Sequence, residues 1–411
     1  MSEIKEKNIS INDYNYTLPE EKIALFPLEN RDESKLLIYK NAQIKNDVFK
    51  NISEHLPPAS LLVFNNSKVI NARLKFKNKN GASIEIFCLE PMNIKADYVI
   101  AMGITGKVQW KCFVGAASKW KEAFLEESFI IGDKKIILKA SIISQKNDYY
   151  IIEFCWEPSS LDFSEILQHA GNTPLPPYIK RDLAITDANR YQTVYAKVEG
   201  SVAAPTAGLH FTKALLSDLE KKQFQLAQIS LHVGAGTFKP VKSATMEGHE
   251  MHAEWIDVSI ETIEKIITNL GSIVATGTTA LRTLESLYWL GVKSIIHPES
   301  DTLNILQWDA YEKKGGLENI NVESSLCSLI SWLKRKNQMR LFTPTQLLIT
   351  PGYQFRVVNV LITNFHQPKS TLLLLIAAAI GENWKECYTH ALENNYRFLS
   401  YGDASVIFMD K

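Results

Sequence analysis

The sequence predicts an α/β protein: a main α/β domain with a largely parallel sheet, interrupted by an inserted small β-barrel domain. Short β-rich segments separated by turn signals such as Asn80-Gly81 predict the barrel between residues 61 and 157. After about residue 158, strand-like segments lead through polar loops into amphipathic helices, which is typical of parallel sheets. We therefore expect residues 1–60 and 158–411 to form the main domain and residues 61–157 to form the insert.

Five β-rich segments are expected in the barrel. The pairs Asn80-Gly81 and Gly132-Asp133 are typical of hairpin turns between such strands. In chain order the expected strands are LLVF (61–64), SIEIFCLE (83–90), KVQWKCFVG (107–115), FIIGDKKIILKASII (129–143, with a turn inside it) and DYYIIEFCW (148–156).

Three neighbouring pairs of a helix and a strand are expected in the main domain, and the opening segment is mixed. Apolar periodicity places Leu281, Leu284 and Tyr288 on one face of a helix. Parallel strands with such connections have ligand sites at their carboxyl ends. The expected pairs are a helix at 214–223 before a strand at 225–234, a strand at 272–277 before a helix at 278–290, and a strand at 357–365 before a helix at 370–381.

The composition excludes several classes of protein. Of 411 residues, 45% are apolar and 22% are charged, a balance typical of globular chains rather than disordered or coiled-coil ones. The 45 basic residues equal the 45 acidic residues, so any polyanion must be bound by a local patch. The five cysteines form no CxxC pair, which argues against a zinc cage. The start of the chain is charged, unlike a signal peptide, and the apolar run at 372–380 is too short to cross a bilayer. We expect a cytoplasmic protein with no membrane partner.

Gly277, Thr278 and Thr279 lie where a predicted strand meets a predicted helix. Glycine allows a tight turn, a threonine hydroxyl can cap the helix, and free N–H groups attract a carboxylate or phosphate. Arg282 and Glu285, about one turn further along the helix, could reach the same ligand. An ordinary capped helix with a surface ion pair is the alternative interpretation.

Two stretches rich in small residues, 200–212 and 231–240, would let the backbone approach a ligand closely. His210 and His232 are the titratable groups nearest to their glycines. Tight packing of strand on helix, with two hydrogen-bonded core histidines, explains the same pattern. The sequence Gly234-Ala235-Gly236 lacks the full GxGxxG spacing, so it indicates a dinucleotide site only weakly.

Residues 249–254, HEMHAE, are the most ionisable cluster of the chain. Read as a strand, they place Glu250, His252 and Glu254 on one face, which suits acid–base chemistry. HxxH offers two metal ligands without the spacing of HExxH, so a metal site is the weaker interpretation. A solvated strand face is the third.

A polar loop joins the last expected strand to its helix. Asn364, His366 and Lys369 offer donors near a helix N-terminus, and Ser370 is the expected N-cap. An ordinary capped connection stiffened by Pro368 is the alternative interpretation.

A basic stripe offers a local patch for a polyanion. Arg73, Lys75, Lys77 and Lys79 share one face if they lie on a strand, and could contact phosphates without reading a sequence. Basic residues also protect sheet edges from aggregation, which is the alternative. A second basic cluster comprises Lys334, Arg335, Lys336 and Arg340.

At this point the chain resembles the S-adenosylmethionine:tRNA ribosyltransferase-isomerase family of queuosine biosynthesis. The resemblance covers most of the chain outside the barrel and the region 292–343. It is carried by YNYTLPEEKIALFPLENRDESKLLIY, VFNNSKVINARL, LPPYIKR, RYQTVYAKVEGSVAAPTAGLHFT, LHVGAGTFKPV, HEMHAEW, TGTTALRTLESL, PGYQFRVVNVLITNFHQPKSTLLLLIAAAIG and YRFLSYGDA.

The resemblance implies an enzyme that transfers and isomerises the ribosyl group of S-adenosylmethionine onto 7-aminomethyl-7-deazaguanine at the tRNA wobble position. The implied products are epoxyqueuosine, adenine and methionine. S-adenosylmethionine is then a co-substrate, with no tightly bound cofactor and no metal, and the protein is a monomer or weak homo-oligomer. A paralogue with another acceptor, a non-catalytic RNA-binding relative and a hydrolase using a metal on HEMH are the alternatives.

This chemistry needs a base that removes a C5′ proton next to the sulfonium, groups that bind the methionine carboxylate and amine, and exclusion of water. Residue chemistry assigns acid–base work to His210, His232 and His252, then Glu254 and Glu285. The residues assigned to S-adenosylmethionine are Gly234, Gly236, Thr237, Gly277, Thr278, Thr279 and Arg282, with Asn364, His366, Lys369 and Ser370 closing the pocket. The residues assigned to nucleic acid are Lys68, Arg73, Lys75, Lys77 and Lys79.

The chain departs from the family pattern at several positions. Ser67-Lys68 and Asn71 stand where the family commonly has Thr-Arg and Pro, and lysine cannot reproduce a bidentate arginine contact. A Lys-Pro-rich stretch after Trp110 is missing, and the segment from Asp309 to Arg340 is longer than usual. These departures concern the handling of tRNA, so they bear on the exact RNA acceptor.

Overall fold

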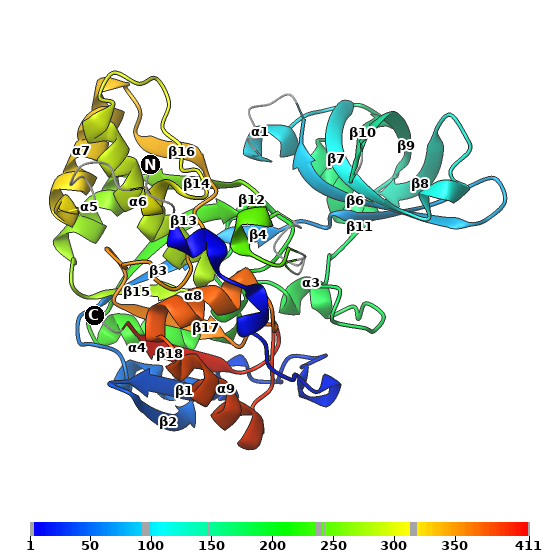
Figure 1. Ribbon diagram of the computed structural model, residues 1–411. Helices are drawn as coiled ribbons and strands as arrows, with labels where there is room; N and C mark the ends of the chain where they lie inside the picture. The colour runs from blue at the N-terminus through cyan, green and yellow to red at the C-terminus, as the bar shows by residue number, and fades with distance from the viewer. Residues whose placement is uncertain are drawn as a thin grey trace.

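The computed structural model describes residues 4–92, 98–146, 148–234, 241, 243–312 and 319–409. Its strands form a nine-stranded sheet, a seven-stranded sheet and a small two-stranded sheet. Figure 1 shows the seven-stranded sheet curling into a half-barrel beside the larger α/β body. The helices are α1 (Tyr98–Met102), α2 (Phe163–Ala170), α3 (Asp187–Arg190), α4 (Lys213–Lys221), α5 (Ile260–Thr268), α6 (Thr278–Ile296), α7 (Val322–Arg335), α8 (Thr371–Ile380) and α9 (Asn383–Glu393).

The nine-stranded sheet is mixed rather than largely parallel. Four neighbouring pairs are parallel (β13–β3, β3–β15, β15–β17 and β1–β18), and the other four pairs are antiparallel. In spatial order its strands are β16 (Arg340–Thr345), β14 (Glu254–Ser259), β13 (Gln225–His232), β3 (Leu61–Asn65), β15 (Ile273–Thr276), β17 (Val360–Asn364), β18 (Ala404–Phe408), β1 (Lys35–Lys40) and β2 (Gln43–Val48).

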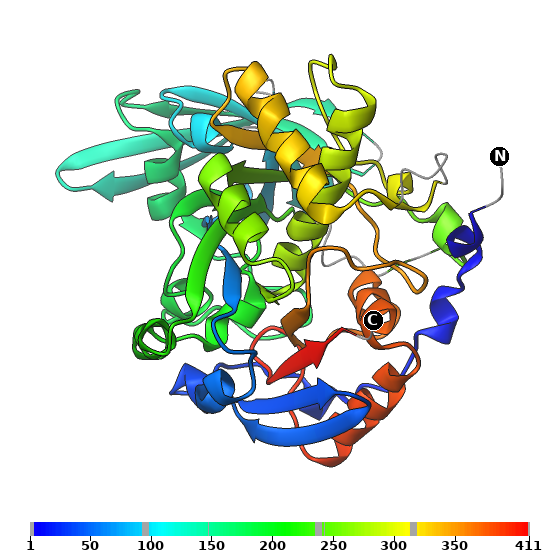
Figure 2. The ribbon, with the colours of Figure 1, turned by 90° about the vertical axis from the view of Figure 1, so that its left-hand side faces the viewer.

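The expectation of a largely parallel sheet was wrong for a physical reason. A single crossover helix returns the chain to the end of the sheet where a parallel strand starts. Two helices, α8 and α9, stand between β17 and β18, so the chain enters β18 from the end at which it left β17. The last strand, β18, then pairs in parallel with the first, β1, as Figure 2 shows for the red and blue strands.

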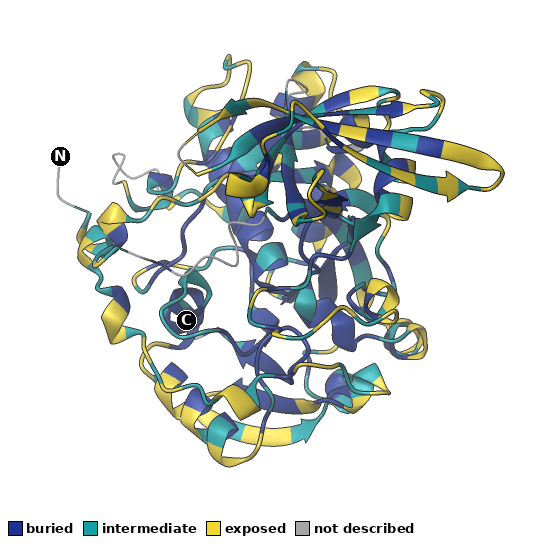
Figure 3. Ribbon diagram, turned by 90° about the vertical axis from the view of Figure 1, so that its right-hand side faces the viewer, coloured by how far each residue is buried: buried dark blue, intermediate teal, exposed yellow. Residues whose placement is uncertain are grey.

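The seven-stranded sheet is antiparallel throughout and contains the predicted hairpin turns at Gly81 and Gly132, both with positive φ. Figure 3 shows exposed and buried bands alternating along its strands, the pattern of a sheet with one face packed on a core. Its spatial order is β11 (Gly171–Asn172), β5 (Arg73–Lys77), β6 (Ser83–Pro91), β7 (Lys107–Gly115), β10 (Tyr150–Glu157), β9 (Lys134–Gln145) and β8 (Leu125–Ile131).

One segment counted with the barrel strands lies elsewhere. Leu61–Asn65 is β3, at the middle of the nine-stranded sheet and buried at every residue. A short apolar run has the same appearance in a barrel and in a parallel core, so sequence could not assign its sheet. The division of domains at residues 60 and 158 stays a prediction.

The chain crosses between the two large sheets at two points that lie side by side. It leaves the main sheet through β4 (Ser67–Val69), which pairs with β12 (Val198–Ser201). It enters the half-barrel past Asn71 and returns past Thr173, whose hydroxyl donates to Asn71 Oδ1 over 3.2 Å. A second contact joins α1 to β12: a Cβ on Gly200, which has φ +126°, would lie 2.4 Å from the Cβ of Tyr98. Only glycine allows this approach.

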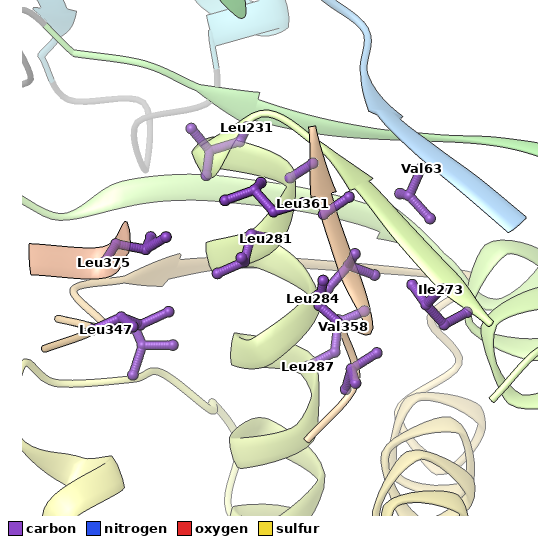
Figure 4. Packing of buried hydrophobic residues seen from close by; sticks show 14 of the residues in the cluster. Val63, Leu231, Ile273, Leu281, Leu284, Leu287, Leu347, Val358, Leu361 and Leu375 are labelled. Atoms are coloured by element: carbon purple, nitrogen blue, oxygen red, sulfur yellow. The ribbon is translucent and has the colours of Figure 1, made fainter. Parts of the chain in front are cut away.

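Helix α6 is the centre of the main core. Leu281, Leu284 and Leu287 pack against β3, β13, β15 and β17, as Figure 4 shows. Each buried leucine contributes about 1.5–3 kcal/mol through the hydrophobic effect. The predicted face of Leu281, Leu284 and Tyr288 is fully buried, and most of the remaining helix is buried as well.

Glu285 fastens α6 to the loop before β17. Its carboxylate accepts hydrogen bonds from the Tyr353 hydroxyl and from the backbone N–H groups of Arg356, Val357 and Val358, over 2.9–3.0 Å. Burial raises the pKa of Glu285 above its ordinary value, and these four donors oppose that shift. The side chain is therefore a buried connection between two elements of the core.

We predict that Glu285→Ala lowers the free energy of unfolding by about 3 kcal/mol or more, because it leaves four buried donors without their acceptor. Urea unfolding measures the change. Glu264→Ala is the matched control: this exposed carboxylate on α5 lies 3.6 Å from Lys334 Nζ, so a change below about 0.5 kcal/mol is expected. Similar losses in both variants would contradict the anchoring role.

Candidate active site

Three neighbouring cavities lie at the carboxyl ends of β13, β15 and β17. The first has a volume of about 90 Å³ and is lined by the stretches 203–207, 277–279 and 363–367, with Ser370. It lies where the predicted strand–loop–helix units meet. Of the predicted residues, it brings together Gly277, Thr278, Thr279, Asn364, His366 and Ser370.

The second and third cavities are larger and share walls with their neighbours. The second, about 620 Å³, lies between the half-barrel and the main sheet, and the third, about 400 Å³, lies beside α6 and α8. Gly234 and His252 line both of them, while Leu372 lines the first and the third. The three cavities are therefore direct neighbours.

The N-terminus of α6 opens on the first cavity without a side-chain cap. Gly277, with φ +91°, occupies the N-cap position, so the expected cap by a threonine hydroxyl was wrong. The Thr279 hydroxyl is buried and has no hydrogen-bond partner among the described residues. Uncapped N–H groups, the positive end of a 19-residue helix and a spare hydroxyl suit an anionic group.

Asn364 brings an unsatisfied acceptor to the same cavity. Its Nδ2 donates to His210 Nε2 over 3.0 Å, and His210 Nδ1 lies 2.8 Å from the hydroxyl of Ser34. This order fixes His210 with its proton on Nδ1. Asn364 Oδ1 is buried and finds no partner in the described part of the chain. The amide is thus held in one orientation and offers an acceptor to a ligand.

His210 and His366 are buried neutral imidazoles. Burial lowers the pKa of each to about 3, and for His210 the nearby charges of Arg397 and Arg31 act in the same direction. Both ring nitrogens of His210 are engaged, and His366 Nε2 lies 3.0 Å from the Thr363 hydroxyl. With a pKa this low, both imidazoles are neutral at neutral pH.

His232 and His252 lie in a different environment. His232 is buried at the end of β13 and stacks on Tyr98 of α1, with ring centroids 4.8 Å apart. His252 is exposed at the rim shared by the second and third cavities. Residues 249–253 are irregular and only Glu254 starts a strand, so the expected strand face of Glu250, His252 and Glu254 was wrong.

Glu254 and Arg282 form a buried ion pair in the wall of the third cavity. The guanidinium also donates from Nε to the carbonyl of Leu347 over 3.1 Å, while its Nη2 has no partner among the described residues. Arg282 therefore faces the third cavity instead of the ligand site at Thr278. Each partner stabilises the charge of the other inside the core.

The other predicted residues divide into three groups. The described residues that line the three cavities do not include Glu285 or Lys369. Ser370 is confirmed as the N-cap of α8, because its hydroxyl accepts from the N–H of Leu373 over 3.2 Å. Gly236 and Thr237 lie outside the described residues.

The basic stripe is partly neutralised. Arg73 pairs with Glu85 on the adjacent strand over 2.5 Å, and Lys68 pairs with Glu199 over 2.8 Å. Lys75 and Lys77 are exposed on β5, whereas Lys79 lies beyond its end. The sequence showed no acidic residue within the stripe, but antiparallel pairing brings one from the next strand.

The aromatic lining of the second cavity was missed by sequence reasoning. Tyr98, Phe113, Tyr149 and Trp255 line it together with His232. They come from the half-barrel, from α1 and from β14, so no linear motif contains them. Phe113 and Trp255 alternate with buried residues along their strands, which was a signal of a second face but not of a cavity.

Two absences concern the described residues alone. No helix among them is long and apolar enough to span a membrane. Within the same ranges, no three histidine, cysteine, aspartate or glutamate side chains gather as a metal site would require.

Comparisons with known proteins agree with these features. Residues 11–407 match the family model described as queuosine biosynthesis protein. An S-adenosylmethionine:tRNA ribosyltransferase-isomerase of Thermotoga petrophila is 39% identical over 97% of this chain and 100% of its own length. Proteins of the same name from Carboxydothermus hydrogenoformans and Nitrosomonas europaea are 36% and 33% identical, over 97% and 98% of this chain and 100% and 97% of theirs.

A crystal structure of S-adenosylmethionine tRNA ribosyltransferase from Thermotoga maritima is also similar, with 29% identity and a TM-score of 0.45 over 96% of this chain and 100% of that one. The match of the family model and the full-length relatives decide the assignment. The chain belongs to the queuosine biosynthesis protein family of S-adenosylmethionine:tRNA ribosyltransferase-isomerases.

Proposed function

We propose that this enzyme transfers and isomerises the ribosyl group of S-adenosylmethionine onto 7-aminomethyl-7-deazaguanine in tRNA, releasing adenine and methionine and leaving epoxyqueuosine. The observation that carries the proposal is the full-length similarity to S-adenosylmethionine:tRNA ribosyltransferase-isomerases, together with the match of residues 11–407 to the family model. The polar groups of the first cavity that lack partners support it, because they match one end of this substrate.

The first cavity binds the methionine end of S-adenosylmethionine. Its volume of about 90 Å³ is below the ~300 Å³ typical of a complete ligand pocket, so it admits only one end of the molecule. The uncapped N-terminus of α6 and Thr279 receive the carboxylate, and Asn364 Oδ1 accepts from the ammonium group. The nucleoside then extends toward the two larger cavities.

The second cavity receives the reacting base of the tRNA. Tyr98, Tyr149 and Trp255 give it aromatic walls, which suit an unstacked nucleobase. Its lining residues come from both the half-barrel and the main sheet, so a base can enter between them while its backbone stays outside. His252, at the rim shared with the third cavity, is the base that removes the C5′ proton, and His210 acts only by positioning Asn364.

The function is tested by mixing the purified protein with S-adenosylmethionine and tRNA carrying 7-aminomethyl-7-deazaguanine. We expect adenine and epoxyqueuosine in equal amounts, quantified by chromatography of the free base and of the digested nucleosides. Tightly bound S-adenosylmethionine without adenine release would indicate another acceptor. If the protein neither binds S-adenosylmethionine nor releases adenine, the proposal is refuted.

We predict that Asn364→Ala weakens S-adenosylmethionine binding about tenfold, because one buried hydrogen bond of about 1.5 kcal/mol is lost. Equilibrium dialysis measures it. Binding of 5′-methylthioadenosine, which lacks the amino-acid end, should change less than twofold. Asn383→Ala is the matched control, because this partly buried amide on α9 bonds to Tyr39. An equal loss of affinity for both ligands would show that the first cavity does not bind the amino-acid end of S-adenosylmethionine.

We predict that His252→Gln lowers the turnover number about 100-fold or more, since general base catalysis contributes at least that factor. The affinity for S-adenosylmethionine should stay within twofold. His297→Gln replaces an exposed histidine that follows α6, and it should retain the wild-type rate. Wild-type turnover in His252→Gln would exclude this residue as the base.

A further inference from the structure

A cluster of arginines lies behind His210, on the side away from Asn364. A small cavity of about 20 Å³ is lined by Arg31, Arg190 and Arg397, with His210 and Ser400. Ser400 also lines the first cavity, so the two spaces share part of one wall. The volume is close to the ~10–15 Å³ that one water-sized group needs.

Arg31 and Arg190 join two loops that are far apart in sequence, around residues 28–31 and 189–192, by hydrogen bonds. Arg31 donates from Nη1 to the carbonyl of Gln192 over 2.6 Å and from Nη2 to that of Asn189 over 3.0 Å. In return, Arg190 donates from Nη1 to the carbonyl of Glu29 over 3.0 Å and from Nη2 to that of Leu28. The acceptors are all peptide carbonyls, which satisfy donors but do not neutralise charge.

The positive charge of the pair is not compensated within the described residues. No carboxylate among them lies within 4.0 Å of Arg31 or Arg190. Asp32, which follows Arg31 in sequence, accepts from the Thr212 hydroxyl over 3.2 Å. Asp403 lies 3.3 Å from Arg397 and also accepts from its N–H.

The two guanidinium groups also act on each other. Burial lowers the pKa of Arg31, and the charge of Arg190 lowers it further. The Nε of Arg190 is buried without a partner in the described part of the chain. A buried N–H donor without an acceptor thus lies beside two positive charges that repel each other. An anion stabilises this arrangement, because it supplies both an acceptor and a compensating negative charge.

We infer that Arg31 and Arg190 bind a phosphate of the tRNA backbone. The inference rests on the proposed function. Guanidinium forks match the oxygens of a phosphate diester, and the narrow cavity admits an oxygen but not a nucleoside. A polymer lying along the surface can present such an oxygen. The site would hold one point of the RNA strand on the main domain while the base is bound elsewhere on the enzyme.

The test measures tRNA affinity against salt concentration. Arg190→Gln should lower the slope of log K against log salt by about one and weaken binding several-fold, whereas S-adenosylmethionine affinity should stay within twofold. Arg356→Gln is the matched control, since this half-buried guanidinium also has an unpartnered Nε but lies over Tyr288 instead of beside a second arginine. It should keep the wild-type slope.

A second arm uses inorganic phosphate and does not depend on catalysis. Phosphate should raise the melting temperature of the wild type more than that of Arg190→Gln. If the enzyme fails to turn over tRNA but shows this difference, the function fails and the anion site stands. If phosphate has the same effect on both and the salt slope is unchanged, the anion site is refuted while the function stands.

Loss of S-adenosylmethionine affinity without loss of tRNA affinity would assign the cluster to the substrate carboxylate and overturn the inference. Should Arg190→Gln fail to fold, as judged by circular dichroism, Arg31→Lys takes its place. Lysine keeps the positive charge but not the planar guanidinium with its paired N–H donors. Binding of tRNA should therefore weaken several-fold, while the slope of log K against log salt stays unchanged. Wild-type affinity in that variant would contradict the site.

Discussion

The candidate site depends on the packing of α6 against four parallel strands. The helix is buried on nearly every side, so its N-terminus is fixed relative to the ends of β15 and β17. Gly277 makes the turn between β15 and α6 with a backbone conformation that favours glycine, and its N–H is bonded to the carbonyl of Ile362 in β17 over 2.8 Å. The uncapped helix end and Asn364 are therefore held to one geometry by the core itself.

A chain of hydrogen bonds extends this order to the N-terminal part of the sequence. Ser34 holds His210, and His210 holds Asn364, so three segments far apart in the chain share one buried network. Because its members are buried, each unsatisfied atom is costly, and the free acceptor of Asn364 is a departure from that rule. Such departures are common where a ligand completes the structure.

The sequence allowed the local elements to be predicted, but not how they meet. The strand–loop–helix units, the turn at Gly81 and the cap at Ser370 are determined by neighbours in sequence, and these are present. The partners of His210 lie 154 and 176 residues away, and pattern alone does not specify such contacts. The same limit explains why the sheet of β3 and the charge partner of Arg73 were not foreseen.

The double crossing at Asn71 and Thr173 has a mechanical consequence. Because the two segments that join the half-barrel to the main sheet lie side by side and are hydrogen-bonded to each other, they resist displacement as one unit rather than as two separate linkers. The close approach of Tyr98 to Gly200 and its stacking on His232 add a second point of attachment, beside the second cavity.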